Sequence, residues 1–385
     1  MRICLLYDCL YPHTIGGAER WYRDIGARLA AEGHDVTYVT LRQWDKDVNP
    51  DFAGVRVVTA GPRLELYAEA GRRRIAPPLV FGLGTLWHLL RHGRGYDVVH
   101  TASFPYFSLL AAGLARRVHG FRLLVDWHEL WTRAYWERYL GRIGGWVGWT
   151  VQHLCLRVPQ RAFTPSRLQA ERLREEGFRG QVTVLDGRYE GTLDPAQARP
   201  ADPFVVFAGR LIPEKQAPAI VPAVKAARER LPDLRGVIFG DGPDRAAVLA
   251  AIAEHGMEGV VEAPGFVDRS RVEDALDRAL CMVLPSRREG YGLVVVEAAH
   301  RGLPSVVVRD PDNAAAELVH DGENGFVAES ASPEDLADAI LRVHSDGDPL
   351  RERTAAWFNH NAARLSLRRS LDRLAELYAG RSARS

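Results

Sequence analysis

Short apolar runs alternate with amphipathic stretches along the first half of the chain. The runs expected to be strands are residues 3–7, 36–41, 55–59, 97–100, 121–126, 162–166 and 182–185. After the first run, Trp21, Ile25 and Leu29 recur every four residues, which predicts a helix from about Ala18 that ends at Gly33. A strand, a helix and a strand form a βαβ unit, which predicts a parallel sheet with a right-handed crossover.

The second half repeats this alternation. Its expected strands are residues 204–209, 236–239, 260–263, 281–284, 303–308 and 325–327, with helices near 220–230, 245–255 and 272–280 between them. We therefore expect an α/β protein with two doubly wound, Rossmann-like domains, at residues 1–190 and 204–358. The Gly-, Pro-, Asp- and Arg-rich residues 191–203 are the expected linker. Leu367, Leu371, Leu374 and Tyr378 predict a helix within residues 359–385 that crosses back onto the first domain.

Two helical stretches of the first half are unusually apolar. One, near residues 79–90, carries Leu79, Leu83, Leu86, Trp87 and Leu90 on one face and is expected to face the core. A membrane-surface helix beside Arg72–Arg74 is the alternative. The other, residues 136–158, is apolar on all sides and contains three tryptophans. It is expected either to pack in the core or to lie against a lipid or an acceptor.

The composition is that of an ordinary soluble protein, with 46% apolar and 26% charged residues and a net charge of +1, and it does not indicate nucleic-acid binding. The charge is uneven, because residues 1–190 hold 26 basic and 19 acidic residues, whereas residues 191–385 hold 24 and 30. The N-terminal half therefore favours an anionic partner. The four scattered cysteines have no metal-ligand spacing. Because the sequence opens on a strand-like run, we expect no signal peptide. We expect a cytoplasmic protein, with peripheral contact to the inner face of the membrane left open.

Candidate chemistry gathers at the ends of the expected strands. Gly16-Gly17 follows the first strand, and Arg210 and Lys215 follow the strand at 204–209. In open α/β sheets, the carboxyl ends of the strands are where ligands bind. Two fixed cations there suit a diphosphate, whose negative charge grows as it departs as a leaving group. The chain has only three lysines against 47 arginines, so Lys215 is a conspicuous choice at this place.

The stretch from Glu289 to Glu297 combines a glycine-rich turn with the start of a helix. Gly290 and Gly292 would let the backbone approach a ligand closely, and the first N–H groups of the helix would receive phosphate. Glu297 would lie one to two turns into the helix, within reach of ribose hydroxyls. Glu289 would lie nearer the loop, within reach of a sugar hydroxyl.

Two histidines, His100 and His128, end or follow successive strands of the first domain. Since the carboxyl ends of parallel strands share one edge of a sheet, we expect both side chains to face the same crevice. Two Asp-x-Asp strings, Asp45–Asp47 and Asp310–Asp312, are close to what chance gives in this chain, and we expect no metal and no cofactor.

These motifs together resemble the family 4 retaining glycosyltransferases, which have the GT-B fold. The residues that carry the resemblance are Gly16-Gly17-Ala18-Glu19-Arg20, Phe207-Ala208-Gly209-Arg210-Leu211 with Lys215, Gly240-Asp241-Gly242-Pro243, Gly265-Phe266 and the Glu289–Glu297 pair. The resemblance covers nearly the whole chain. It implies two Rossmann-like domains facing across a cleft, the N-terminal one on the acceptor side and the C-terminal one binding the donor.

The resemblance also assigns roles to residues. It implies that Arg210 and Lys215 bind the donor diphosphate, that Glu289 contacts the donor sugar and that Glu297 binds the ribose. His128 would be the histidine of the catalytic site. The residues expected to line the donor site besides Glu297 are Gly16, Gly17, Gly240, Phe266, Gly290, Tyr291, Gly292 and Leu293.

The implied reaction moves a sugar from a nucleotide-diphosphate sugar to an acceptor hydroxyl, with retention of anomeric configuration and without a metal. The acceptor is either a small molecule or a lipid-linked molecule. A nucleotide-sugar epimerase of the same two-domain fold is the alternative, and a non-catalytic nucleotide-sugar binder is a further one. The sequence departs from the family pattern at Asp186-Gly187-Arg188-Tyr189 and at residues 309–313, where a Gly-Gly loop is common, so sugar and acceptor specificity stay open.

Overall fold

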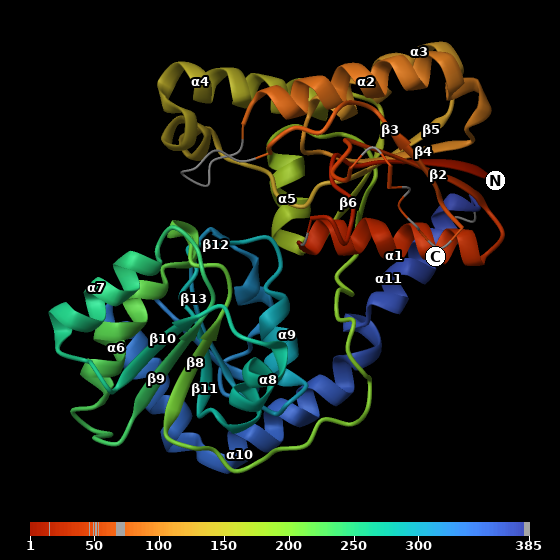
Figure 1. Cartoon of the computed structure of the whole chain (residues 1–385). Coiled ribbons are helices and arrows are strands. Elements are labelled where there is room, and N and C mark those ends of the chain that lie inside the picture. Colours follow the sequence, from red (N-terminus) through yellow and green to blue (C-terminus); the bar gives the residue numbers. More distant parts are fainter. Residues whose placement is uncertain are drawn as a thin grey trace. The chain divides into compact units, whose positions relative to one another are not determined.

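The N-terminal strands form a parallel sheet whose described part has seven strands in the order β3-β2-β1-β4-β5-β6-β7 (Figure 1). The structure is a computed structural model that describes residues 1–380 except 15, 46, 49, 51, 53 and 67–73. The strands are β1 Arg2–Leu6, β2 Asp35–Thr40, β3 Arg56–Thr59, β4 Val98–Ala102, β5 Arg122–Asp126, β6 Arg161–Thr164 and β7 Val182–Val184. The helices are α1 Gly17–Ala31, α2 Ala76–His92, α3 Phe107–His119, α4 Arg133–Leu156 and α5 Arg167–Glu175.

Strand order fixes which helices share a face of this sheet. The chain runs outward from β1 to β2 and β3, and then crosses to β4, β5 and β6 on the other side of β1. Because parallel crossovers are right-handed, α1 lies on one face and α2, α3 and α4 lie on the other. Figure 1 shows α2, α3 and α4 above this sheet and α1 below it.

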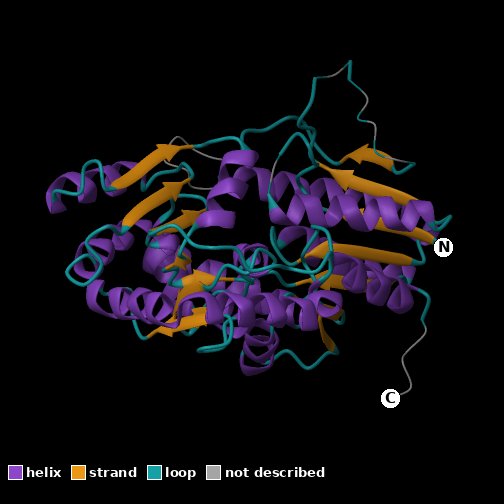
Figure 2. Ribbon diagram, turned by 90° about the horizontal axis from the view of Figure 1, so that it is seen from below, coloured by secondary structure: helices purple, strands orange, loops and turns teal. Residues whose placement is uncertain are grey.

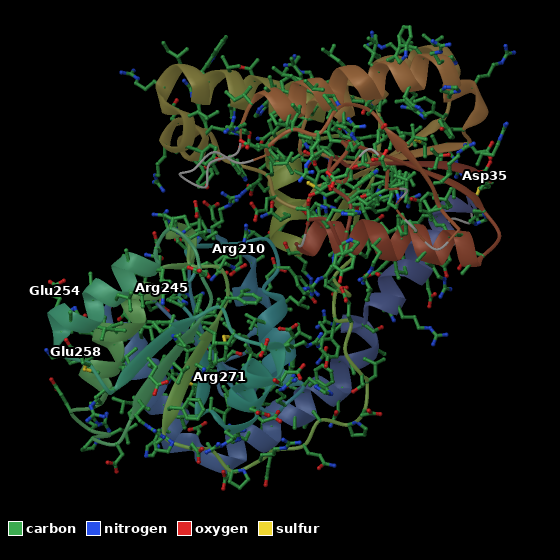
Figure 3. The ribbon with its side chains drawn as sticks, viewed as in Figure 1. Asp35, Arg210, Arg245, Glu254, Glu258 and Arg271 are labelled. Carbon is green, nitrogen blue, oxygen red and sulfur yellow. The ribbon has the colours of Figure 1, made fainter. Side chains whose placement is uncertain are left out.

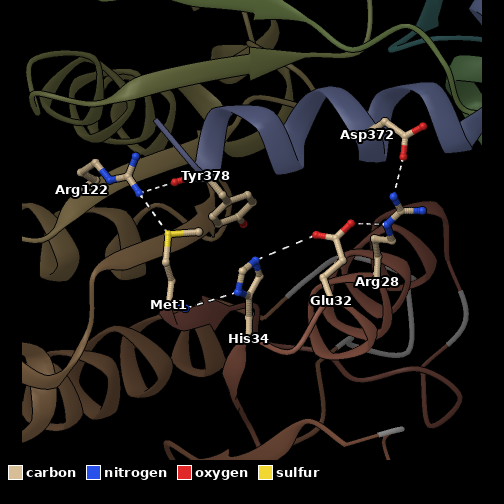
Figure 4. A network of polar contacts seen from close by, with 7 residues as sticks. All are labelled: Met1, Arg28, Glu32, His34, Arg122, Asp372 and Tyr378. Atoms are coloured by element: carbon tan, nitrogen blue, oxygen red, sulfur yellow. Dashed lines mark hydrogen bonds and ion pairs between the residues drawn. The ribbon is translucent and has the colours of Figure 1, made fainter. Parts of the chain in front are cut away.

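The C-terminal helix α11, Leu367–Tyr378, packs on the α1 side of the same sheet from Ser370 onward. The guanidinium of Arg28 on α1 pairs with Asp372 at 2.7 Å, and Arg122 donates to the carbonyl of Tyr378 (Figure 4). Inside the sheet layer, His100 Nδ1 lies 2.5 Å from the Tyr378 hydroxyl. The last helix is therefore part of the first compact unit, which comprises residues 1–185 and 370–385.

The second compact unit, residues 186–369, has its own parallel sheet with the order β10-β9-β8-β11-β13-β15 in the described residues. Its strands, which are among the orange arrows of Figure 2, are β8 Phe204–Ala208, β9 Arg235–Phe239, β10 Val261–Gly265, β11 Cys281–Leu284, β13 Ser305–Val308 and β15 Gly325–Ala328. Two further short strands, β12 Arg288–Glu289 and β14 Asp312–Asn313, pair with each other in parallel. The helices are η2 Pro213–Lys215, η3 Ala217–Ala219, α6 Ile220–Ala227, α7 Arg245–His255, α8 Arg269–Arg278, α9 Leu293–Ala299, η4 Ala314–Leu318 and α10 Pro333–Leu365.

The segment expected to be a linker packs against the second unit. Ala196 is buried, and its backbone N–H donates to Asn359 Oδ1 at 2.7 Å. The N–H of Tyr189 donates to the carbonyl of Leu365 at 3.0 Å. Residues 359–365 belong to α10, whose helical geometry breaks at Gly347. The observed units therefore divide after Leu185, and the chain returns to unit 1 only from Ser370.

The expected core-facing stripe of the helix near residues 79–90 is wrong. Leu83 is 70% exposed and Trp87 is 64% exposed, and Leu79 and Leu90 are exposed as well. The buried face of α2 instead includes Phe81, Thr85, His88 and Leu89. The periodicity finds an apolar stripe on the helix, but the sheet side of α2 is the other face. The accompanying Arg72 and Arg73 lie outside the described residues.

The second apolar stretch, residues 136–158, is partly buried and partly exposed. Gly141 has a φ of 75°, which breaks α4 into two segments, and Trp136 is buried. A Cβ on Gly148 would lie 2.5 Å from the Trp136 ring, so the second segment packs against that ring. Ile143 and Trp146 remain 82% and 53% exposed, so core packing accounts for only part of this helix.

Stability should fall in mild acid because of His88. Burial, with smaller contributions from His92 and Arg56, lowers the pKa of this imidazole from 6.5 to about 4. Between these values the unfolded chain binds the proton and the folded chain does not, so the free energy of unfolding decreases as pH falls from 6.5 toward 4, by up to about 3 kcal/mol.

Urea unfolding at several pH values measures this pH dependence. His88→Gln should flatten the profile over this range, whereas His360→Gln, at an exposed site, should leave it unchanged; equal profiles for both variants would refute the assignment.

Candidate functional site

The carboxyl edge of the second sheet brings together the loops that follow β8 and β11. From β8 the chain runs outward to β9 and β10, and then crosses to β11 on the opposite side of β8. The strand order therefore reverses between β8 and β11, which is the position where open α/β sheets form ligand crevices. Arg210 and Lys215 follow β8, and Glu289 follows β11.

An ion pair joins these two loops. Lys215 Nζ donates to Glu289 Oε1, which also accepts a hydrogen bond from Ser286 Oγ at 2.9 Å. Both charged side chains are largely buried, with 19% and 11% of their surfaces exposed. The backbone N–H of Arg287 donates to the carbonyl of Glu214 at 2.9 Å, so the loops are also linked through their main chains.

The other expected cation differs from Lys215 in its surroundings. Arg210, labelled in Figure 3, is exposed. Within the described part of the chain, no carboxylate pairs with its guanidinium. Glu289 Oε2 accepts no hydrogen bond in the described residues either. The crevice edge therefore offers an uncompensated cation and a carboxylate oxygen that a ligand can use.

Gly240 and Gly242 serve the packing of this edge. Gly240 has a φ of 129°, and a Cβ there would lie 1.8 Å from the carbonyl oxygen of Gly209. The same atom on Gly242 would lie 2.4 Å from the carbonyl oxygen of Leu211. The loop after β9 thus lies directly against the backbone that carries Arg210, which only glycine permits.

The turn from Gly290 to Leu293 begins α9 as the sequence predicts. Gly292 has a φ of 95°, and a Cβ there would lie 2.5 Å from the Ala315 side chain, so glycine is required. Glu297 is the fifth residue of α9 and is partly exposed. The hydroxyl of Tyr291 donates to the carbonyl of Asp186, and burial raises the pKa of this phenol. Tyr291 therefore ties the turn to the segment that enters unit 2.

Two polar residues of this edge are missing from the sequence-based list. Ser286 holds Glu289, as described above. Asn313, in the segment where the sequence departs from the family pattern, is buried and donates to the carbonyls of Ser286 and Val308 at 3.0 and 2.7 Å. Its Oδ1 accepts the N–H of Ala315 at the start of η4, which is the N-cap role that asparagine favours. Asparagine is a favoured N-cap residue, and this preference is the feature of the sequence that could have indicated the role of Asn313.

Phe266 follows β10 at the same edge, and its side chain is 86% exposed. The backbone N–H of Gly240 donates to the carbonyl of Gly265 at 3.0 Å, so the loops after β9 and β10 are neighbours. An exposed aromatic ring on an ordered edge loop offers a stacking surface for a flat ligand group.

In unit 1, the expected site residues lie at the carboxyl ends of β1 and β5. Gly16 is the N-cap of α1, and a Cβ there would lie 2.3 Å from Glu19 Oε2. A Cβ on Gly17 would meet no atom within 4 Å in the described residues. His128 follows β5 by two residues and is partly exposed. Of the two glycines, only Gly17 has open space beside its Cα in the described residues, because Glu19 fills the space beside Gly16.

The expectation that His100 shares a crevice with His128 is wrong. His100 lies inside β4 and is fully buried. Its Nε2 lies 3.2 Å from Asp126 Oδ2, which also accepts a hydrogen bond from Trp21 Nε1 at 2.7 Å. This imidazole links the sheet to α11 through Tyr378, and Asp126 links the sheet to α1 through Trp21.

Metal-ligand side chains do not gather in the described residues: no group of three or more His, Cys, Asp or Glu there is arranged to hold an ion. Asp310 Oδ1 accepts the backbone N–H of Asp312 at 2.9 Å, and Asp45 pairs with Arg63 at 2.8 Å. Both Asp-x-Asp strings thus include a carboxylate that is used locally.

Comparison with known families agrees with these motifs. Residues 193–357 match the family model of glycosyl transferases group 1, and residues 16–186 match the glycosyl transferase 4-like domain. The chain thus carries a glycosyl transferase 4-like domain followed by a group 1 glycosyl transferase domain. Its two parallel-sheet α/β domains are those of the GT-B fold class.

The relatives of this chain differ in how much of it they match. Alpha-D-kanosaminyltransferase of Streptomyces kanamyceticus is 32% identical over 46% of this chain and 45% of its own length. Glycogen synthase of Mycobacterium tuberculosis is 25% identical over 97% of this chain and 91% of its own length. The matched part of the chain spans less than half the length of the first relatives it resembles. Among solved structures, Anabaena HepE in complex with UDP has a TM-score of 0.74 at 17% identity, covering 99% of this chain and 100% of HepE.

Proposed function

We propose that this chain transfers a sugar from a nucleotide-diphosphate sugar to an acceptor hydroxyl, with retention of anomeric configuration. The observation that carries the proposal is the pair of cationic side chains at the strand-order reversal of unit 2. Lys215 is held in place by Glu289, and Arg210 is uncompensated within the described residues. A diphosphate is the leaving group that two such cations would stabilise.

In the proposed reaction, the bond between the anomeric carbon and the diphosphate oxygen breaks, and a bond to the acceptor oxygen forms on the same face of the sugar. The acceptor hydroxyl loses its proton to the departing diphosphate. Arg210 and Lys215 stabilise the negative charge on that diphosphate, so the mechanism requires no metal ion. Glu289 orients the sugar through its Oε2, and Glu297 accepts hydrogen bonds from the ribose.

The remaining residues receive roles in the same scheme. Phe266 and the Gly290–Leu293 turn line the donor site. Gly16 and Gly17 of unit 1 keep the donor-site role that the resemblance implies, and His128 of the same unit is assigned to the catalytic site. The UDP bound by HepE supports a nucleotide donor for this chain as well. The epimerase alternative gains no support from the named relatives.

A donor screen tests the proposal. Thermal unfolding with UDP-, GDP-, dTDP- and ADP-sugars should show one nucleotide that raises the melting temperature, since a ligand at 100 times its Kd stabilises by about 2.7 kcal/mol. The selected donor should then release its nucleoside diphosphate in the presence of candidate acceptors. An epimerase would instead convert the donor sugar with no acceptor present. No stabilisation by any of the four donors would contradict the proposal.

A further inference from the structure

The outer helices of unit 1 carry an apolar surface that its own core does not use. In the described residues, most of the large apolar side chains that are exposed lie on or beside α2, α3 and α4. The most exposed are Leu83 at 70%, Val118 at 68% and Ile143 at 82%, with Trp87 and Trp146 at 64% and 53%. Soluble proteins rarely leave so many large apolar groups together on one side without a use for them.

These helices form one layer of unit 1. The right-handed crossovers place α2, α3 and α4 on the same face of the sheet, as Figure 1 shows. Helices α2 and α3 run side by side in the same direction, because Gly82 lies against Phe107 and Gly93 lies against His119. His119 Nε2 lies 3.2 Å from the carbonyl of Leu90, so the C-terminal ends of the two helices meet. We call the exposed side of α2, α3 and α4 the outer face.

The charge of the outer face has one sign. Residues 76–96, 105–119 and 131–157 contain eight arginines and one acidic residue, Glu137. Glu137 pairs with Arg133 on the same helix at 2.9 Å. The guanidinium of Arg91 lies 5.0 Å from the centroid of the exposed Trp87 ring. Arginine, tryptophan and leucine side chains therefore share a surface with almost no negative charge.

The apolar and basic composition of the outer face favours one of its possible binding partners over another. A second copy of the chain would bring two positively charged faces together, since a twofold interface pairs a patch with itself. An anionic bilayer offers negative headgroups to the arginines and an apolar boundary to Leu83, Trp87 and Ile143. In the described part of the chain, no helix is both long and apolar enough to cross a membrane, so the contact would be with the surface.

We propose that the outer face of unit 1 binds the surface of an anionic phospholipid bilayer. The apolar side chains insert at the headgroup boundary, and the arginines attract the negative lipids. The proposal goes beyond the transfer reaction and does not depend on it, because vesicle binding is measured without donor or acceptor.

Vesicle flotation with the full chain tests the proposal. Wild type should float with phosphatidylcholine vesicles that contain 30% phosphatidylglycerol, and binding should weaken as salt is raised, because salt screens charge. Leu83→Glu combined with Trp87→Glu should lower the bound fraction at least tenfold, and Arg91→Glu combined with Arg94→Glu should lower it as well. Leu249→Glu, at a 43% exposed leucine on α7, is the matched control and should bind as wild type does.

Three outcomes would overturn the proposal. Wild type does not float with the anionic vesicles at low salt, or it floats equally well with pure phosphatidylcholine. Alternatively, sedimentation shows a dimer that the Leu83→Glu, Trp87→Glu variant converts to a monomer, which would make a second copy the occupant. Because both substituted side chains are mostly exposed, circular dichroism and melting temperature should match wild type and so exclude misfolding as the cause.

Discussion

Replacing Lys215 with alanine should lower the rate of sugar transfer by roughly 100- to 1,000-fold, as does the loss of one preorganised group that stabilises developing charge. Lys215 Nζ is fixed by Glu289 at the strand-order reversal, so it is already placed for the departing diphosphate. Steady-state kinetics with the selected donor measure the effect, which should fall mainly on kcat.

Lys225→Ala is the matched control for this variant. Lys225 is an exposed lysine on α6 in the same unit, and its loss should leave turnover within about twofold of wild type, since an isolated surface charge contributes little. Both variants should keep the wild-type circular dichroism spectrum. Turnover of the Lys215→Ala variant at the wild-type rate would remove this residue from the mechanism.

Replacing Asp126 with alanine should destabilise the protein by about 3 kcal/mol. The buried carboxylate accepts from Trp21 Nε1 at 2.7 Å and lies 3.2 Å from His100 Nε2. Its removal leaves the Trp21 indole N–H, a buried donor, without its acceptor, which costs about 1–3 kcal/mol. It also takes away the carboxylate that lies beside the buried His100 ring. Urea unfolding followed by tryptophan fluorescence measures the change in the free energy of unfolding.

Asp372→Ala provides the comparison for Asp126. Asp372 on α11 pairs with Arg28, but its side chain is 44% exposed, and such surface pairs contribute at most about 1 kcal/mol. The Asp126 variant should therefore be much less stable than the Asp372 variant. If both lose the same small amount, the buried network does not hold α1 and α11 on the sheet.

The sequence predicts the alternation of strands and helices well, because apolar runs and four-residue spacing report the local periods directly. It predicts less well which face of a helix is covered. The stripe at Leu83 and Trp87 has the spacing of a core-facing helix, yet the sheet lies on the opposite side of α2. Which face is buried depends on neighbours that come later in the chain, and the pattern of one helix does not specify them.

The candidate site, like the fold, is predicted only in part from the sequence. The glycines and charged residues at strand ends were visible in the sequence, because chemistry at that edge follows from the parallel topology. His100 was misassigned because its position at the end of a strand does not reveal that Tyr378, 278 residues later, covers it. Asn313 was missed because its partners, Ser286 and Val308, are known only once β12 and β14 pair.

A crystal structure with the nucleoside diphosphate chosen by the donor screen would test the donor site most directly. We predict that its phosphates lie within hydrogen-bonding distance of Arg210 and Lys215, and that its ribose hydroxyls donate to Glu297. A diphosphate bound away from the carboxyl ends of β8 and β11, with no contact to Lys215, would contradict the proposed mechanism.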